Sequence, residues 1–259
     1  MTETPPHDAR WRVRTFCRVG WTIASIFVVE AAVCGLATVP VLLLWMWLVE
    51  WTTSASVLRT IVFSVSIVPS YILFALCLMT LSPIATRITG ARTPRNAEMR
   101  LSDMGWPLMT WARYVAATHV VRQLAGPLFR GSPIWTAYLR LNGARIGRRV
   151  YVNTLFISDH NLLEFGDDVV IGSEVHISGH IVEGGVLKTA GVRLGRHVTV
   201  GLGSVIDIDV EADHDCQIGA LSLVPKHTRL EAGAVYAGIP ARRIDQQAPD
   251  RAGDRRPRP

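Results

Sequence analysis

The sequence predicts two architectures in one chain: an N-terminal transmembrane helical hairpin, and after it an all-β, left-handed parallel β-helix. Three observations support this prediction. Two long apolar stretches lie in the first third of the chain, the composition changes abruptly near residue 145, and aliphatic residues then recur every six positions. Of the 259 residues, 49% are hydrophobic and only 19% are charged, whereas about 25% is typical of soluble domains. A single soluble globular domain therefore describes this chain poorly.

The two apolar stretches are long enough to cross a bilayer. Residues 21–49 contain one charge, Glu30, and residues 60–86 contain none. Each stretch exceeds the roughly 20 residues that span the hydrocarbon. We expect two transmembrane helices in residues 21–86, joined by the short linker 50–59. The first is too long, and too soon followed by another span, to be a removable signal peptide.

Arginines predict the orientation of this hairpin. They flank both spans on the outside, and the linker holds only one: Arg10, Arg12, Arg14 and Arg18 before, Arg87, Arg92, Arg95 and Arg100 after, and Arg59 between. The positive-inside rule places both ends, including the basic segment 1–20, in the cytoplasm of a bacterium with the spans in its inner membrane. For Glu30 two interpretations stay open, a functional carboxylate or a bonded group at a helix contact.

Residues 87–144 form a linking region with helical periodicity between Trp106 and Leu141. The apolar positions are too interrupted by arginine and histidine for a third span. An amphipathic helix on the inner leaflet fits this pattern. Packing against the C-terminal domain fits it equally well.

A period of six residues defines the C-terminal domain, residues 145–244. The period is unbroken over eight positions: Leu194, Val200, Ile206, Ala212, Ile218, Val224, Leu230 and Tyr236. Earlier members are Phe165, Ile171 and Ile177, while Ile146 and Val152 are one residue out of phase. One inward aliphatic residue in every six makes one flat side of a triangular coil. We expect about five coils, each stacking its aliphatic residues on the next.

The period breaks once in a way that suggests a functional loop. The interval from Ile177 to Leu194 is one residue short of three repeats, and segment 180–191 (HIVEGGVLKTAG) has no clean inward series. We expect this segment to leave the coil, because loops on a rigid scaffold commonly carry function.

Other counts exclude several classes of protein. The four cysteines form no CxxC pair, which argues against a disulfide scaffold or a zinc site. The net charge is +6, but no basic stripe interleaved with aromatic residues predicts nucleic-acid binding. The segment 245–259 is charged and rich in proline, so we expect it to be disordered.

Four motifs in the repeat region resemble those of the hexapeptide-repeat acyltransferases. They are IGSEVHISGH (171–180), VRLG (192–195), IGALSLVPK (218–226) and YAGIPARRI (236–244). Within that family the chain is most similar to the membrane-bound C-terminal region of poly-amino-acid synthetases of the nonribosomal ε-poly-lysine type. The segments that carry this similarity are PLFRGSP (127–133), YLRLNGARIG (138–147) and GHIVEGGVLK (179–188).

The resemblance implies an acyltransferase that works as a homotrimer, with acyl-CoA or a carrier protein's phosphopantetheine thioester as donor and no metal. His180, which precedes the excursion, would be the general base. Glu183 and Lys188 would orient the imidazole or meet a hydroxyl or amine acceptor, although solvated loop charges are an alternative. The implied donor-binding residues are Gly201, Gly219, Ala220, Lys226 and Arg242. A carrier protein or a nonribosomal peptide synthetase would be the partner.

Two other functions remain open from the residues alone. The first is a trimeric, membrane-tethered scaffold without catalysis, which would assemble a biosynthetic complex. The second is a metalloenzyme like the γ-class carbonic anhydrases, which share the β-helix. His176 and His180 have the four-residue spacing of two metal ligands, but no histidine lies about two coils upstream as the third.

Overall fold

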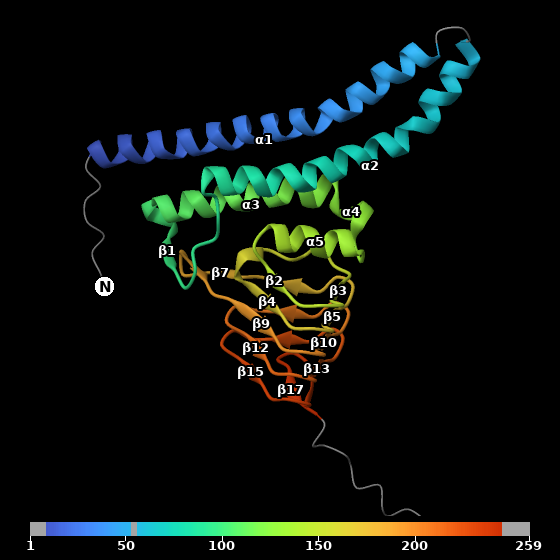
Figure 1. Ribbon diagram of the computed structural model, residues 1–259. Helices are drawn as coiled ribbons and strands as arrows, with labels where there is room; N and C mark the ends of the chain where they lie inside the picture. Colours follow the sequence, from blue (N-terminus) through green and yellow to red (C-terminus); the bar gives the residue numbers. More distant parts are fainter. Residues whose placement is uncertain (1–8, 53–55, 245–259) are drawn as a thin grey trace, which may run out of the picture.

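A layer of long helices lies across one end of a tapering stack of short strands (Figure 1). The computed structural model describes residues 9–52 and 56–244. The segment 245–259, expected to be disordered, lies outside the described residues. The helical layer contains α1 (Ala9–Trp51), α2 (Ser56–Thr89) and α3 (Trp106–Leu124), with α4 (Gly126–Phe129) and α5 (Pro133–Leu141) beneath it.

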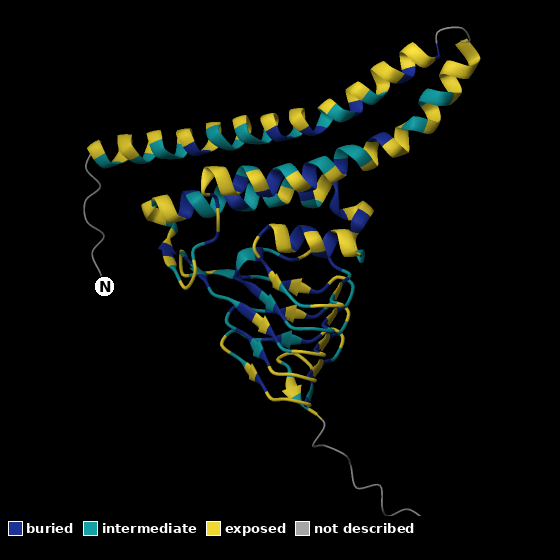
Figure 2. Cartoon of the chain, in the orientation of Figure 1, coloured by how far each residue is buried: buried dark blue, intermediate teal, exposed yellow. Residues whose placement is uncertain are grey.

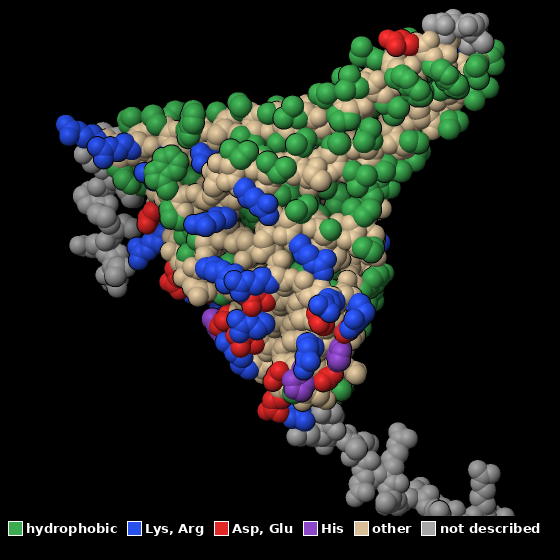
Figure 3. All heavy atoms as spheres, viewed as in Figure 1, with side chains coloured by type: hydrophobic (Ala, Val, Ile, Leu, Met, Phe, Trp, Pro, Cys, Tyr) green, Lys and Arg blue, Asp and Glu red, His purple; other side chains and the backbone are tan. Residues whose placement is uncertain are grey.

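The first two helices form an apolar antiparallel hairpin. With 43 and 34 residues, α1 and α2 are about 65 and 51 Å long, well beyond the roughly 30 Å of a hydrocarbon core. By length and composition both can cross a membrane. Both bend along their length (Figure 1), and each contains an internal proline, Pro40 or Pro69, which favours a kink. Large apolar side chains cover their outer face (Figures 2 and 3).

The helices exceed the expected spans at both ends. α1 begins within the arginine-rich segment, and both helices extend into the linker expected at residues 50–59. These extensions contain no proline, so each helix continues past its apolar stretch. Between the helices, the fully buried Ala37 and Ala75 permit close packing, and Trp45 Nε1 donates a hydrogen bond of 2.8 Å to Ser70 Oγ.

The linking region contains three helices, α3, α4 and α5, where the sequence showed a single helical periodicity between Trp106 and Leu141. A Gly-Pro pair ends α3, and Ser132 caps α5 by accepting a hydrogen bond from the Trp135 backbone N–H. α3 lies between the hairpin and the strands (Figure 1), with Tyr114 and Val121 buried. α5 closes the end of the strand stack, where Trp135 Nε1 donates to the Thr154 carbonyl at 3.0 Å. Packing against the C-terminal domain is thus observed for this region.

The strands that follow form three parallel sheets through which the chain turns repeatedly, here called the coil (residues 145–244). One sheet contains β2, β4, β9, β12 and β15, the second β3, β5, β10, β13 and β16, with β17 antiparallel at its edge, and the third β6, β11 and β14. Their bounds are β2 (Arg145–Ile146), β3 (Tyr151–Val152), β4 (Leu163–Phe165), β5 (Val170–Ile171), β6 (His176–Ile177), β9 (Val192–Leu194), β10 (Thr199–Val200), β11 (Val205–Ile206), β12 (Glu211–Ala212), β13 (Gln217–Ile218), β14 (Leu223–Val224), β15 (Arg229–Leu230), β16 (Val235–Ala237) and β17 (Arg242–Arg243).

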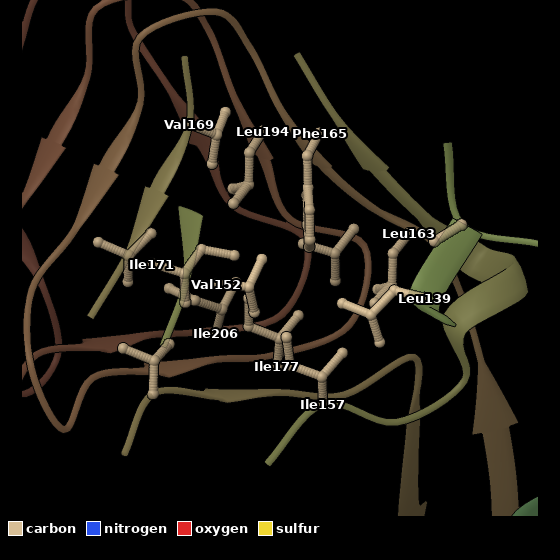
Figure 4. Close-up of a cluster of buried hydrophobic side chains, with 14 of the residues drawn as sticks. Leu139, Val152, Ile157, Leu163, Phe165, Val169, Ile171, Ile177, Leu194 and Ile206 are labelled. Carbon is tan, nitrogen blue, oxygen red and sulfur yellow. The ribbon is translucent and has the colours of Figure 1, made fainter. Parts of the chain in front are cut away.

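The six-residue period corresponds to the register of these sheets. Val200 pairs with Ile218 and Ile218 pairs with Tyr236, so equivalent positions recur after every three repeats. The predicted inward residues are buried, except Ile146, which is only partly buried. Those labelled in Figure 4 point toward one another inside the coil. At the turns, residues three positions before an inward residue adopt a left-handed conformation, among them Asp168, Asp209 and Asp215. Aspartate tolerates this region better than most side chains do.

The segment expected to leave the coil forms an antiparallel hairpin of β7 (His180–Glu183) and β8 (Val186–Thr189). β1 (Glu98–Arg100), from the helical side of the chain, pairs with β8 and completes a separate sheet. Leu187 is fully buried there in an apolar cluster with Met99, Leu108 and Met109. The excursion is therefore an ordered element that packs beneath α3.

A buried histidine at the junction of helices and coil predicts acid sensitivity. Burial lowers the pKa of His160 to about 4. Because this pKa lies below that of an unfolded histidine, near 6.5, the unfolded chain binds more protons between these values, and stability falls as the pH drops from about 6.5 to 4. Over this whole pH range the free energy of unfolding falls by about 3 kcal/mol.

Thermal unfolding of the detergent-solubilised protein at several pH values tests this prediction. We expect the melting temperature of wild type to fall between pH 7 and pH 5, and the fall to be smaller in His160→Gln, which cannot titrate. If the melting temperatures of the two proteins fell equally with pH, His160 would not be a neutral buried side chain.

Candidate active site

His180 stands at the point where the chain leaves the coil, as the first residue of β7. Its Nδ1 lies 2.5 Å from Oδ2 of Asp159, a residue just before the short 3₁₀ helix His160–Leu162. The Asp159 side chain is fully buried, while 26% of the His180 side chain is exposed. The structure thus forms a His–Asp pair with its aspartate inside the protein and its imidazole reachable from outside.

Four hydrogen bonds hold the Asp159 carboxylate. Oδ1 accepts from Thr93 Oγ1 at 2.7 Å and from Trp111 Nε1 at 3.1 Å. Oδ2 accepts from Ser158 Oγ at 3.0 Å, besides its contact with His180. Burial alone would raise the pKa of Asp159, but the hydrogen bonds from His180, Thr93 and Ser158 outweigh it, so the pKa is lowered. The buried carboxyl is therefore ionised at neutral pH.

An ionised acceptor at Nδ1 determines how the imidazole is protonated. Nδ1 carries the hydrogen that it donates to Asp159, and in the neutral ring the lone pair is then on Nε2. Ser178 Oγ lies 3.3 Å from Nδ1, farther than Asp159, and also donates to the His180 carbonyl at 2.8 Å. Among the described residues no group hydrogen-bonds Nε2. Nε2 is thus the atom available to a substrate proton.

The helical layer contributes directly to this pair. Trp111, on α3, places its ring edge-on to the imidazole with centroids 5.1 Å apart, and its indole N–H binds Asp159. Thr93 comes from the segment after α2. The coil supplies Ser158, Asp159 and His180, so neither part of the chain builds the site alone.

Asp159 is the residue that sequence reasoning missed. It lies well before His180 in the chain, and nothing in their spacing links them. The only signal is its place between Val152 and Phe165, where the six-residue phase slips by one. Its backbone is left-handed (φ 53°), and a Cβ added at Gly179 would lie 2.7 Å from the Asp159 Cβ. The glycine immediately before His180 therefore permits the close approach of the two segments.

The other predicted catalytic residues lie along the hairpin and do not contact His180. Glu183 forms ion pairs with Lys188, at 3.4 Å, and with Lys226. The hydrogen bond from Lys226 is the main reason why the pKa of Glu183 is lowered. Lys226 belongs to the coil, so these contacts tie the hairpin to the coil's side. All three side chains are about one-third exposed, and such surface pairs contribute little stability.

Three of the predicted donor-binding residues share one corner of the coil. A Cβ at Gly201 would lie 2.5 Å from the Ala220 nitrogen, and one at Gly219 would lie 3.0 Å from the Ala237 Cβ. Glycine is required there because successive coils approach closely. Arg242 is exposed in β17 and pairs with Ala237 in the sheet. The structure brings Lys226 to Glu183 and does not bring Arg242 to His180.

The histidines considered as metal ligands have other partners. His176 stacks on Phe156 with ring centroids 4.4 Å apart. His197 lies between Asp168, at 3.3 Å, and Asp215, at 3.0 Å, at a different corner of the coil. Within residues 9–52 and 56–244, no three histidine, cysteine, aspartate or glutamate side chains are grouped so that they could hold a metal ion.

Comparison with curated proteins finds a synthetase of a polymeric amino acid. No family model matches the chain. The δ-poly-L-ornithine synthetase of Acinetobacter baumannii (strain AB307-0294) is 27% identical over 169 residues, which cover 64% of this chain and 12% of the synthetase. The chain therefore spans about one-eighth of the length of this relative.

Among solved structures, the chain is similar in fold to several acetyltransferases. A galactoside acetyltransferase in complex with coenzyme A is 22% identical with a TM-score of 0.38, and covers 50% of this chain and 80% of its own. A hexapeptide-repeat acetyltransferase from Vibrio cholerae, complexed with acetyl coenzyme A, is 20% identical with a TM-score of 0.37, and covers 39% of this chain and 59% of its own.

Proposed function

We propose that this protein is a membrane-anchored acyltransferase, in which His180 is the general base and Asp159 holds its imidazole in the reactive tautomer. The reaction transfers an acyl, aminoacyl or peptidyl group from a thioester to a hydroxyl or amine. One observation carries this proposal: a partly exposed imidazole is hydrogen-bonded through Nδ1 to a buried, ionised carboxylate. The same constellation activates nucleophiles on unrelated folds.

The proton movements follow from this geometry. Nε2 of His180 removes the proton of the acceptor as its oxygen or nitrogen attacks the thioester carbonyl. The tetrahedral intermediate then collapses and breaks the carbon–sulfur bond, and the imidazolium returns the proton to the departing thiolate. Asp159 stays ionised and stabilises the imidazolium. Backbone N–H groups near the glycine-rich corners are the proposed donors to the oxyanion.

The donor is acyl-CoA or an acyl group on a carrier protein's phosphopantetheine. Two of the similar acetyltransferases were solved with coenzyme A or acetyl coenzyme A. The similarity to a poly-ornithine synthetase supports a carrier protein or a nonribosomal synthetase as partner. Gly201, Gly219, Ala220, Lys226 and Arg242 remain the proposed donor contacts, and Glu183 and Lys188 the proposed acceptor contacts.

We further propose that the coil is a left-handed β-helix that assembles into a homotrimer. Leu202, Leu221 and Ile239 recur at one corner of successive coils, and 52%, 66% and 75% of each is exposed. A column of exposed apolar side chains is typical of a protein interface.

The membrane placement is also part of the proposal. The arginines of α1 and Arg87, in the last turn of α2, lie at the same end of the antiparallel hairpin. From this end Arg87 donates to the Leu141 carbonyl of α5, the helix that closes the coil. The positive-inside rule then places the coil in the cytoplasm beneath a bacterial inner membrane.

A scaffold without catalysis would not require a buried ionised carboxylate beside an exposed imidazole.

Loss of the base tests the proposal directly. We expect His180→Ala to reduce product formation by about 10²-fold or more, because general base catalysis contributes that much. Product is measured in the producing cell and in reconstituted membranes with candidate thioesters, at matched expression and oligomeric state. The control is His197→Ala, a histidine paired with aspartates at another corner of the coil. A wild-type rate for His180→Ala would make the protein a scaffold.

The role of Asp159 is tested by Asp159→Asn. The amide can donate to Nδ1, which favours the tautomer with its hydrogen on Nε2, so we expect kcat to fall by about 10²-fold with KM little changed. Thr93→Val is the graded control, since it removes one of four hydrogen bonds to Asp159 and leaves the His180 contact in place. Equal kcat values in wild type and Asp159→Asn would refute the tautomer mechanism.

Light scattering in detergent tests the trimer. We expect the mass of three chains for wild type, and a smaller species for Leu221→Arg, because a charge at the centre of the apolar column is costly to bury. A fully active monomer would place the complete active site within one chain.

A further inference from the structure

A cavity of about 440 Å³ lies where α1, the end of α2 and α3 meet. Its size falls within the range of about 300–1,000 Å³ that is usual for small-molecule sites. Apolar side chains line most of it, among them Val29 and Ala117. Trp21 and Val28, at its rim, are 64% and 68% exposed on the outer face of α1. The cavity is therefore bounded by side chains that would face lipid.

Two residues of opposite charge, Arg113 and Glu30, line this mostly apolar cavity and do not pair with each other. Arg113, on α3, donates from Nε to Ser25 Oγ at 3.0 Å, but its Nη2 is buried and has no hydrogen-bond partner among the described residues. Glu30, on α1, also lines the cavity, and no hydrogen bond or ion pair joins it to another described residue. A buried donor without a partner is costly, so Arg113 favours an anionic ligand. Glu30 is only partly buried, and its carboxylate favours a cationic ligand in the same cavity.

One end of the cavity lies at the headgroup region of a bilayer. Trp21 marks the change along α1 from the arginine-rich beginning to the apolar stretch that follows. Arg18 lies over the ring of Trp106, the first residue of α3, at 5.5 Å from its centroid. Tryptophan and arginine are enriched at this level of a membrane. From this level the cavity extends into the apolar stretch, because Glu30 lies nine residues beyond Trp21, about 13.5 Å along α1.

We propose that this cavity binds a zwitterionic membrane lipid with a primary ammonium headgroup, its phosphate on Arg113 and its ammonium on Glu30. An anionic lipid would satisfy only Arg113 and would leave Glu30 unpaired. A lipid with a quaternary ammonium offers Glu30 no hydrogen to accept. Ser25, which binds Arg113, and Glu30 are five residues apart on α1, about 7.5 Å along the axis, and both line the same cavity.

Native mass spectrometry of the full-length protein tests the proposal. The protein is released from nanodiscs that contain equal amounts of phosphatidylethanolamine, phosphatidylglycerol and phosphatidylcholine with identical acyl chains. We expect one retained phosphatidylethanolamine per chain in wild type. In Arg113→Leu and in Glu30→Gln its occupancy should fall by about tenfold or more, because each loses a charged hydrogen bond. Arg122→Leu, on α3 but outside this cavity, is the control.

A second measurement needs no variant. Phosphatidylethanolamine is compared with its mono-, di- and trimethylated forms, and retention by wild type should decrease as the ammonium loses its hydrogens. Equal retention of the methylated series, preferential retention of phosphatidylglycerol, or no retained lipid would each overturn the proposal. None of these readouts depends on acyl transfer, so the proposed activity and the lipid site are tested separately.

Discussion

The buried charge of Asp159 is the constraint on which the rest of this structure depends. An ionised carboxylate taken out of water costs several kcal/mol unless hydrogen bonds replace its hydration. The donors come from distant parts of the chain: Thr93 after α2, Trp111 on α3, Ser158 beside it in the coil, and His180 at the start of the excursion. Removing any of these elements would leave the carboxylate short of a partner. The helical layer and the coil are thereby joined through one side chain.

The excursion hairpin extends the same junction. Its second strand, β8, pairs with β1 from the helical side, and Leu187 packs among methionine and leucine side chains of β1 and α3. On its other side, Glu183 contacts Lys226 of the coil. The hairpin is therefore held between the two parts of the molecule. His180 therefore stands at a surface to which both the helical layer and the coil contribute.

Irregularity in the coil is concentrated where the candidate site lies. Far from the helices, equivalent positions are three repeats of six apart, as from Ile206 to Val224. Near the helices the interval from Val152 to Ile171 is one residue longer, and the interval from Ile177 to Ile206 is longer still because it includes the hairpin. The extra residues of these two intervals surround Asp159 and His180. The regular coils serve as a rigid support, and Asp159 and His180 lie in the irregular segments, while Ile157 occupies the inward position beside Ile177.

The sequence by itself determined the features that depend on local pattern. The apolar stretches became α1 and α2, the period of six became the three-repeat register of the parallel sheets, and the broken repeat before Leu194 became the hairpin. These features were predictable because hydrophobic periodicity reports directly on which residues face a core or a membrane. His180 was selected on a different basis, because the resemblance to the hexapeptide-repeat acyltransferases implies a general base just before the excursion.

Only the tertiary structure decided which groups surround His180. Asp159 lies more than three repeats before it, and Thr93 and Trp111 lie farther still, on segments whose local patterns indicate only a loop and a helix. The one-residue phase slip before Phe165 marked an irregular turn but not its partner. Contacts of this kind depend on how two separately folded parts are packed against each other, which no period within either part encodes. The same packing created the cavity between α1 and α3, which Glu30 lines from α1 and Arg113 lines from α3.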